Sequence, residues 1–199
     1  MEMGHAAPQP SDYASGSAFV GMFREPSTRM ASGFAHAFHD CPAMTSKYGC
    51  DEHAVVICPA VMQVTVEKVK EYFDCVKGCQ TRMTVGESCG HRKNVENVEP
   101  SADQIKEAIR HIRQNFVYVG ITEQFEDSVK DFSKLMGRTV PPPMEAFGNS
   151  NPGRDGAKQA EAEVIAILRA NNLVDHADEQ VYAVAKEKHD NIHVECAAQ

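Results

Sequence analysis

The stretch "FVGMFREPSTRMASGFAHAFH", residues 19–39, decides the expected fold. Its first five residues are apolar or glycine, which is typical of a short strand buried on both faces. Pro26 suits the first turn of a helix, because a missing N–H donor does no harm there. Apolar side chains then recur at every fourth position, at Met30, Phe34 and Phe38. We therefore predict a strand over residues 17–23 and a helix over residues 27–39.

The later part of the chain shows one more strand pattern, "NFVYVGIT" at residues 115–122. The segment before it is predicted to be a helix, because Ser101 and Gln104 form a capping box ahead of an apolar stripe. Thr122 is expected to cap the helix that follows the strand. The buried stripe of that helix is predicted at Phe125, Val129, Phe132 and Met136.

Three further helices complete the predicted elements: one from residue 65, one over residues 157–171, and a last one capped by Asp175. Residues 40–60 are interpreted as irregular. The order of elements favours an α/β sandwich with a mainly parallel sheet, for which two strands are fewer than the usual four or five. Either an edge strand such as "AVVIC", residues 54–58, completes the sheet, or the chain lacks its first strand–helix–strand unit.

Composition sets limits on the function. The 199 residues carry a formal net charge of −8, which disfavours broad nucleic-acid binding. A hydrophobic content of 42% fits one globular domain, predicted over residues 16–199 after a flexible segment at residues 1–15. No apolar run is long enough to cross a bilayer.

Seven cysteines are present: Cys41, Cys50, Cys58, Cys75, Cys79, Cys89 and Cys196. They are either reduced, partly buried thiols or a set of disulfides in a secreted domain. Cys79 with Cys89 is one possible bridge, and Cys41 with Cys50 or Cys58 is another. His36, His39 and Cys41 also form an H-x-x-H-x-C pattern, but no second ligand pair stands at a spacing typical of zinc sites.

The turn after the first predicted strand carries the strongest functional signal. Arg24 stands at the carboxyl end of that strand, where ligands bind in open α/β sheets. Ser32 follows eight residues later, on the predicted helix. A guanidinium and a hydroxyl are donors that suit a phosphate group. Arg29 lies between them and either joins the phosphate site or forms a salt bridge.

The residues Arg24, Pro26, Arg29, Ser32 and Phe34 resemble the R-x-P-x-x-R-x-x-S-x-Y pattern of sulfotransferases that use 3′-phosphoadenosine 5′-phosphosulfate (PAPS). Phe34 departs from the usual tyrosine of that pattern. The resemblance implies a P-loop-like sulfotransferase sandwich in which Arg24 and Ser32 hold the 3′-phosphate of the sulfate donor, supported by Arg29.

Three later segments are similar to the carbohydrate O-sulfotransferases of the heparan-sulfate 6-O and 2-O type. They are "GCQTRM" (78–83), "FVYVGITEQFEDSVKDF" (116–132) and "NNLVDHADEQVYAVAKEKH" (171–189), in the order that the family has them. The loop "FGNSNPGRDG" (147–156) stands where the family carries an Asn/Ser loop near the nucleotide. The resemblance implies that Gln80 and Arg82 lie near the acceptor, and that Asn149, Ser150 and Arg154 cover the nucleotide.

One part of the family pattern is missing. Residues 1–16 hold no lysine or arginine, so the basic turn that grips the 5′-phosphosulfate is not found, and neither is the catalytic base. We expect a partial sulfotransferase domain that uses PAPS and no metal, acts on a carbohydrate, and belongs to the Golgi.

Three alternatives stay open beside this interpretation. The first is a non-catalytic remnant of such an enzyme, and the second is a disulfide-stabilised binding domain without transfer activity. The third, a P-loop phosphotransferase, would need a G-x-x-x-x-G-K-S/T turn, which the sequence lacks.

Overall fold

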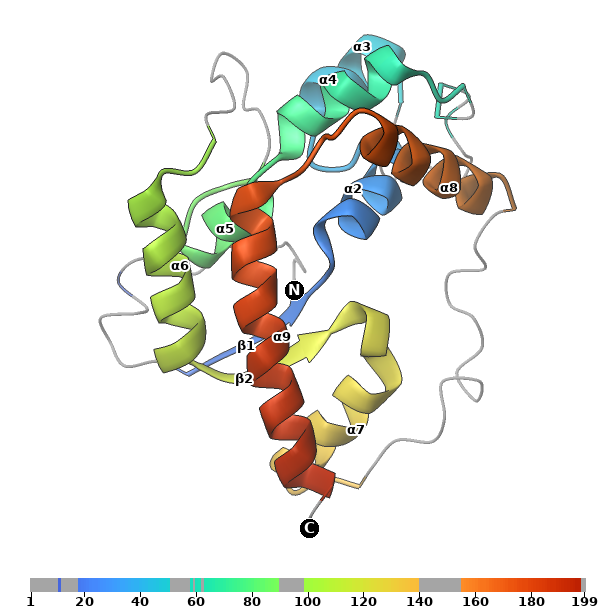
Figure 1. Ribbon diagram of the computed structural model, residues 1–199. Helices are drawn as coiled ribbons and strands as arrows, with labels where there is room; N and C mark the ends of the chain where they lie inside the picture. The colour runs from blue at the N-terminus through green and yellow to red at the C-terminus, as the bar shows by residue number, and fades with distance from the viewer. Residues whose placement is uncertain are drawn as a thin grey trace.

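The computed structural model describes residues 11, 18–50, 58, 60–61, 63–89, 99–139 and 155–197. Within them the fold is α/β and mostly helical, as Figure 1 shows. The elements in chain order are β1 (Phe19–Phe23), α2 (Pro26–Ala35), α3 (Pro42–Tyr48), α4 (Val66–Val76), α5 (Cys79–Thr84), α6 (Ala102–Gln114), β2 (Phe116–Ile121), the 3₁₀ helix η1 (Thr122–Gln124), α7 (Phe125–Leu135), α8 (Asp155–Ala170) and α9 (His176–Ala197). Among the described residues no helix has the length and apolar character needed to cross a membrane.

The sheet consists of β1 and β2 over the described residues, paired in parallel as the sequence predicts. Gly21 lies opposite Val119, and Phe23 opposite Ile121. Helices α9 and α7 both pack against β2, whereas Val20 and Met22 of β1 are 52% and 46% exposed. The prediction that β1 is buried on both faces is therefore wrong, since none of the described helices covers these two side chains.

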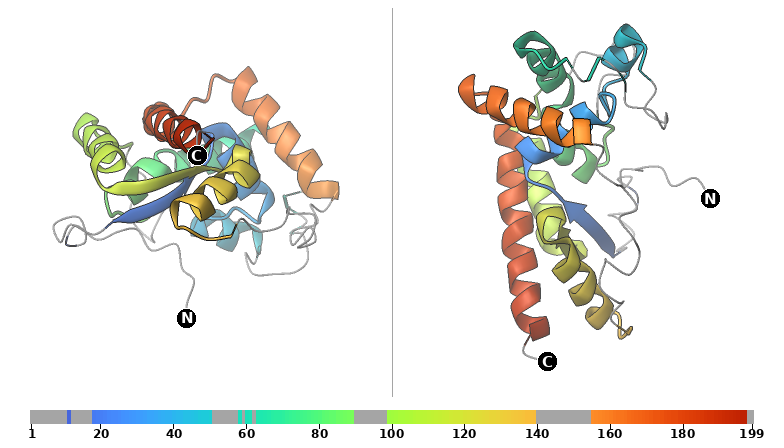
Figure 2. Two further views of the ribbon diagram at one scale, coloured as in Figure 1. Left: turned by 90° about the horizontal axis from the view of Figure 1, so that it is seen from below. Right: turned by 90° about the vertical axis from the view of Figure 1, so that its right-hand side faces the viewer.

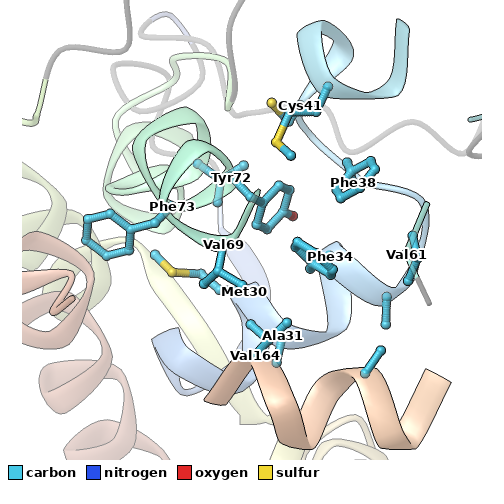
Figure 3. Packing of buried hydrophobic residues seen from close by; sticks show 14 of the residues in the cluster. Met30, Ala31, Phe34, Phe38, Cys41, Val61, Val69, Tyr72, Phe73 and Val164 are labelled. Carbon is cyan, nitrogen blue, oxygen red and sulfur yellow. The ribbon is translucent and has the colours of Figure 1, made fainter. Parts of the chain in front are cut away.

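The buried side chains form two hydrophobic clusters. Helices α2, α3, α4 and α8, which carry the first cluster, lie above the two strands in Figure 1 and in the right-hand view of Figure 2. The helical cluster joins α2, α3, α4 and α8, and its centre is shown in Figure 3. There the ring of Phe34 meets those of Phe38 and Tyr72 edge-on, at centroid distances of 4.9 and 5.7 Å. The sheet cluster joins β1, β2, α6 and α9 around Val119 and Ile121. The segment from Arg24 to α2 connects one cluster to the other.

Three disulfides lie in or beside the helical cluster: Cys41–Cys75, Cys50–Cys58 and Cys79–Cys89. The predicted Cys79–Cys89 bridge is confirmed. The predicted pairing of Cys41 with Cys50 or Cys58 is wrong, because α4 runs beside the start of α3 and places the Cα of Cys75 5.9 Å from that of Cys41. Cys196 is the free and buried thiol of the described part of the chain.

The helix predicted over residues 27–39 ends at Ala35. Beyond it, Ala37, Phe38 and Asp40 have φ values of 60°, 60° and 64°, so the backbone leaves the helical region. Phe38 is still fully buried, because the turn folds it back onto the helical cluster. The residues after the turn were expected to be irregular, but Pro42 begins the short helix α3 and Gly49 ends it in a left-handed conformation.

The predicted capping box of α6 is confirmed: Ser101 Oγ accepts from Gln104 N–H, and the Gln104 side chain accepts from Ser101 N–H. Asp175 is also confirmed as a cap of α9, because its Oδ1 accepts the N–H of Asp178 at 3.2 Å. Thr122 is not the predicted cap of α7, since it is the first residue of η1.

The predicted apolar stripe of α7 is correct only at its centre, where Val129 and Phe132 are partly buried and the Phe132 ring packs against Tyr118. Phe125 and Met136, at its two ends, are 40% and 55% exposed, whereas Ser128 and Asp131 are buried. The Ser128 hydroxyl accepts the N–H of Ile121, and Asp131 pairs with His193 of α9. Ser128 and Asp131 lie next to Val129 and Phe132 on the helix, and their partners on β2 and α9 satisfy them there. Residues 54–57 of the candidate edge strand lie outside the described residues, as do residues 1–10 and 12–17.

Candidate functional site

The carboxyl ends of β1 and β2 meet at one edge of the sheet. Arg24 and Glu25 follow β1, and Glu123 follows β2 within η1. The Nε atom of Arg24 lies 3.8 Å from Oε1 of Glu123, and the N–H of Glu25 donates to the same oxygen at 3.1 Å. This edge is where ligands bind in parallel sheets, and the structure places Arg24 there as predicted from the strand pattern.

The backbone of Arg24 is held by the side chain of Gln80 on α5. The Arg24 N–H donates to Gln80 Oε1 at 3.0 Å, and Gln80 Nε2 donates to the Arg24 carbonyl at 2.9 Å. A primary amide satisfies both backbone groups of an extended residue in the same way as a neighbouring strand would. Gln80 therefore fixes the position from which the guanidinium projects.

The guanidinium of Arg24 has an unused donor. Its side chain is 33% exposed, yet Nε is buried and has no hydrogen-bond acceptor within the described part of the chain. The carboxylate of Glu123 is too far from it for a hydrogen bond. Buried donors are normally satisfied, so this Nε is an unmet donor that a phosphate oxygen could satisfy only after a movement of the side chain exposes it; Nε of Arg29 is unsatisfied in the same way.

Ser32 lies on the side of α2 that turns toward Glu123. Thr28, one helical turn earlier, donates from its hydroxyl to Glu123 Oε1 at 2.8 Å. Residues four apart share a face of a helix, so Ser32 is the next side chain on that face. It is half-buried, and no hydrogen bond of its hydroxyl is seen among the residues that the structure describes. No contact of Ser32 with Arg24 or Glu123 is seen among the described residues, so the convergence of Ser32 and Arg24 on one anion stays a prediction.

Arg29 points to a different set of partners. Its Nη2 donates to the carbonyl of Val76 at 3.0 Å and to Oδ2 of Asp178 at 3.3 Å, and it lies 3.6 Å from Oδ2 of Asp175. The structure therefore shows the salt bridge that the sequence left open for Arg29. Its role as a support of the phosphate stays a prediction.

Asp175 and Asp178 are functional candidates that the sequence did not single out beyond the cap at Asp175. Asp178 is fully buried and accepts hydrogen bonds from the N–H groups of Gln80 and Thr81 and from the Thr81 hydroxyl, at 2.8–2.9 Å. Asp175 accepts the N–H of Gly78 at 2.8 Å. Burial, and then the charge of Asp178, raise the pKa of Asp175 to about 7.

Arg82 is buried on α5, and its Nη2 donates to the carbonyl of Lys77 at 2.6 Å. Burial lowers the pKa of Arg82. Gln80 and Arg82 therefore have structural contacts at the start of α5, and their predicted contact with an acceptor stays a prediction. Asn149, Ser150 and Arg154 lie outside the described residues.

Cys41 of the H-x-x-H-x-C pattern is in a disulfide, so it offers no thiolate to a metal beside His36 and His39. Among the described residues, no group of three His, Cys, Asp or Glu side chains is placed to hold a metal ion.

A cavity of about 300 Å³ lies between the start of α2, the end of α8 and the segment before α9. Its lining is formed by Glu25, Pro26, Ser27, Met30, Leu168, Arg169, Asn172, Leu173, Val174, Asp175 and Glu179. Arg24 and Ser32 do not line it, so the cavity and the strand edge are neighbouring but separate features.

At the edge of the sheet, Arg24 and Thr28 both contact Glu123, and a guanidinium is a group that can bind an anion. Comparison with known proteins adds no relative: no family model, no curated protein and no solved structure matches this chain.

Proposed function

We propose that the protein is a PAPS-dependent sulfotransferase domain that transfers a sulfuryl group to a hydroxyl of a carbohydrate. One observation supports this most. Segments that resemble the family motifs, and that are far apart in the sequence, meet around Arg24. Gln80 of "GCQTRM" binds its backbone, and Glu123 of "FVYVGITE" lies beside its guanidinium. Asp178 of the last motif binds the N–H of Gln80 in turn.

In the proposed site Arg24 and Ser32 bind the 3′-phosphate of the donor. This phosphate is remote from the sulfur, so both residues would position the donor and take no part in bond making. Sulfuryl transfer also needs a base for the acceptor hydroxyl and cations near the leaving phosphate. The partly exposed guanidinium of Arg24 at the strand end supports the anion site, and no residue is assigned as the base.

The three disulfides support an oxidising compartment, because cytosolic thiols are kept reduced. This agrees with a place in the Golgi lumen, where a carbohydrate acceptor and PAPS would be met.

A transfer assay tests the proposal. The chain is incubated with ³⁵S-labelled PAPS and a panel of desulfated glycans, and label on the glycan is counted. We expect transfer by the wild-type chain and at least tenfold less by Arg24→Ala, on the order of the loss of one charge-assisted phosphate contact. The matched control is Arg113→Ala, an exposed arginine of α6, which should keep the wild-type rate. Transfer at equal rates by all three chains would contradict the assigned site.

A second candidate is a binding domain without transfer activity. The pairing of Arg24 with Glu123 favours it, because a nearby carboxylate both partners the guanidinium and repels an anion. Calorimetry with adenosine 3′,5′-bisphosphate separates three cases. Binding with transfer supports the enzyme, and binding without transfer supports a remnant. The absence of both supports a domain with no nucleotide site.

A further inference from the structure

A chain of hydrogen bonds connects the start of α9 to the backbone of Arg24. Asp178 accepts the N–H of Gln80 at 2.9 Å and the N–H of Thr81 at 2.8 Å, which are donors of the first turn of α5. The side chain of Gln80 in turn exchanges two hydrogen bonds with the backbone of Arg24. The first turn of α5 would otherwise leave these donors unpaired, because its N-cap Gly78 offers no side chain.

The contacts of Asp178 are those of a rigid connection. The residue has no solvent exposure, and the Thr81 hydroxyl adds a further bond to Oδ1 at 2.8 Å. A buried carboxylate with charge-assisted bonds holds its donors more firmly than neutral acceptors do. Each bond of Gln80 to Arg24 therefore depends on a backbone segment that Asp178 fixes.

We propose that Asp178 is a positioning residue for the anion site: through the first turn of α5 and the amide of Gln80, it sets the place of Arg24. The proposal rests on the proposed function for what Arg24 binds, but not for how Arg24 is held. Asp178 is not proposed to contact the sulfate donor or the carbohydrate acceptor.

Charged side chains near Asp178 come from α2, from α5 and the residues after it, and from the start of α9. Arg29 of α2 is 3.3 Å away, and Asp175 precedes α9. Arg82 of α5 and Glu87 beyond it also interact with this group of charges. Of these charged residues, Asp178 is the one that accepts the N–H of Gln80. The substitution Asp178→Asn therefore removes the negative charge where the chain of hydrogen bonds to Arg24 begins.

The test is amide hydrogen exchange measured by NMR on the full chain. In Asp178→Asn we expect the Arg24 amide to exchange at least about tenfold faster, since loss of a hydrogen bond to a charged group is worth about one to two factors of ten. The amide of Ile112 in α6 is the reference for global opening and should be unchanged. The matched control Glu179→Gln, an exposed neighbour on α9, should leave both rates as in wild type.

A second variant keeps the test valid where Asp178→Asn does not fold. Thr81→Val preserves shape and removes one bond to Asp178, so a twofold to fivefold faster exchange at Arg24 is expected, roughly half the effect of a full bond to a charged group. An unchanged exchange rate at the Arg24 amide would overturn the proposal. An equal increase in the exchange rate of the Ile112 amide would also overturn it, because it would show that the whole fold is destabilised.

Binding of adenosine 3′,5′-bisphosphate is measured on the same samples. Weaker binding by Asp178→Asn, with faster exchange at Arg24, supports both the positioning role and the proposed function. Faster exchange in a chain whose wild type does not bind the nucleotide overturns the proposed function alone. Unchanged binding with faster exchange overturns the claim that the place of Arg24 matters to the site.

Discussion

Arg24 lies beside the carboxylate of Glu123 at the carboxyl edge of the sheet. Glu123 provides charge at 3.8 Å without a hydrogen bond, while the buried Nε donor lacks an acceptor among the described residues. The same carboxylate oxygen accepts from the backbone of Glu25 and the hydroxyl of Thr28, so Glu123 organises the edge of the sheet as well as facing Arg24. An incoming anion gains the guanidinium but is repelled by Glu123.

The charge of Glu123 can be separated from its structural role. In Glu123→Gln the amide oxygen still accepts from Glu25 and Thr28, whereas the negative charge is gone. We expect adenosine 3′,5′-bisphosphate to bind about threefold to tenfold more tightly, because a charge some 5–8 Å from the phosphate costs on the order of 1 kcal/mol at intermediate dielectric. Calorimetry measures this, with the exposed Glu126→Gln of α7 as control. Weaker binding would show that Glu123 orients Arg24 rather than opposing the ligand.

At the scale of single residues, the sequence predicted the place of Arg24 at a strand end because strand and turn signals are local. It could not predict that Gln80 holds the backbone of Arg24, 56 positions away, since nothing in the residues near Gln80 indicates that partner. The buried role of Asp178 was missed for the same reason. A D-x-x-D pattern at the start of a helix reads as a cap, and its contacts with α5 are long-range.

Among the elements, α2 and α4 meet at Gly33. A Cβ atom at this position would overlap the hydroxyl oxygen of Tyr72, which donates to the carbonyl of His39 at 2.7 Å. The backbone turn that ends α2 is thus held by a tyrosine that fits only against glycine. This contact sets how α2, with Arg24 before it and Ser32 on it, lies against the helical cluster.

A double-mutant cycle tests that contact. Gly33→Ala should lower the free energy of unfolding by about 1–3 kcal/mol, the usual cost of overpacking. In the Tyr72→Phe background, where the hydroxyl is gone, the same change should cost at least about 1 kcal/mol less. Urea unfolding of the four chains gives the coupling energy. Equal costs in the two backgrounds would contradict the packing described here.

Elements with strong local signals were predicted well. The capping box at Ser101 located the start of α6, and the strand pattern at residues 115–122 located both ends of β2 to within one residue. The buried face of α7 was predicted only in part: Val129 and Phe132 are partly buried, whereas Phe125 and Met136 are exposed. Ser128 and Asp131 face inward there because partners on β2 and α9 satisfy them, and such partners are not visible in the sequence of α7.

For the whole molecule, the buried carboxylates at the start of α9 join the helical cluster to the sheet cluster. Asp175 contacts α5 and Arg29, and its pKa is raised from 3.8 to about 7. The folded state therefore holds the proton more tightly than the unfolded state. The stability from this group is fully present below about pH 4 and is lost as the pH rises through about 7.

The raised pKa predicts that the free energy of unfolding depends on pH, and that Asp175→Asn lacks this dependence. The free energy of unfolding of the wild type, taken relative to Asp175→Asn, should fall by about 2–4 kcal/mol between pH 4 and pH 7.5. His193, whose pKa is raised by Asp131, gives a change of the same sign in both chains, so it cancels in the difference. Urea unfolding at several pH values measures it. A constant difference across this range would mean that Asp175 keeps an ordinary pKa.

At this scale the sequence predicted the α/β class, but it left open whether the cysteines are reduced or bridged, and it did not predict which helices share a core. The pairing of Cys41 with Cys75 depends on α4 lying beside the start of α3, a contact between segments 34 residues apart. The sulfotransferase sandwich itself stays a proposal, because the two parallel strands described here are compatible with other α/β architectures.

The most direct measurement is the preference of the chain for a 3′-phosphate. Calorimetry compares adenosine 3′,5′-bisphosphate with adenosine 5′-monophosphate, on the wild type and on Arg24→Ala. If Arg24 holds the 3′-phosphate, the wild type binds the bisphosphate at least about tenfold more tightly, and Arg24→Ala loses this preference. Equal affinity of the wild type for both nucleotides, or a preference that survives in Arg24→Ala, would contradict the donor site placed at this strand edge.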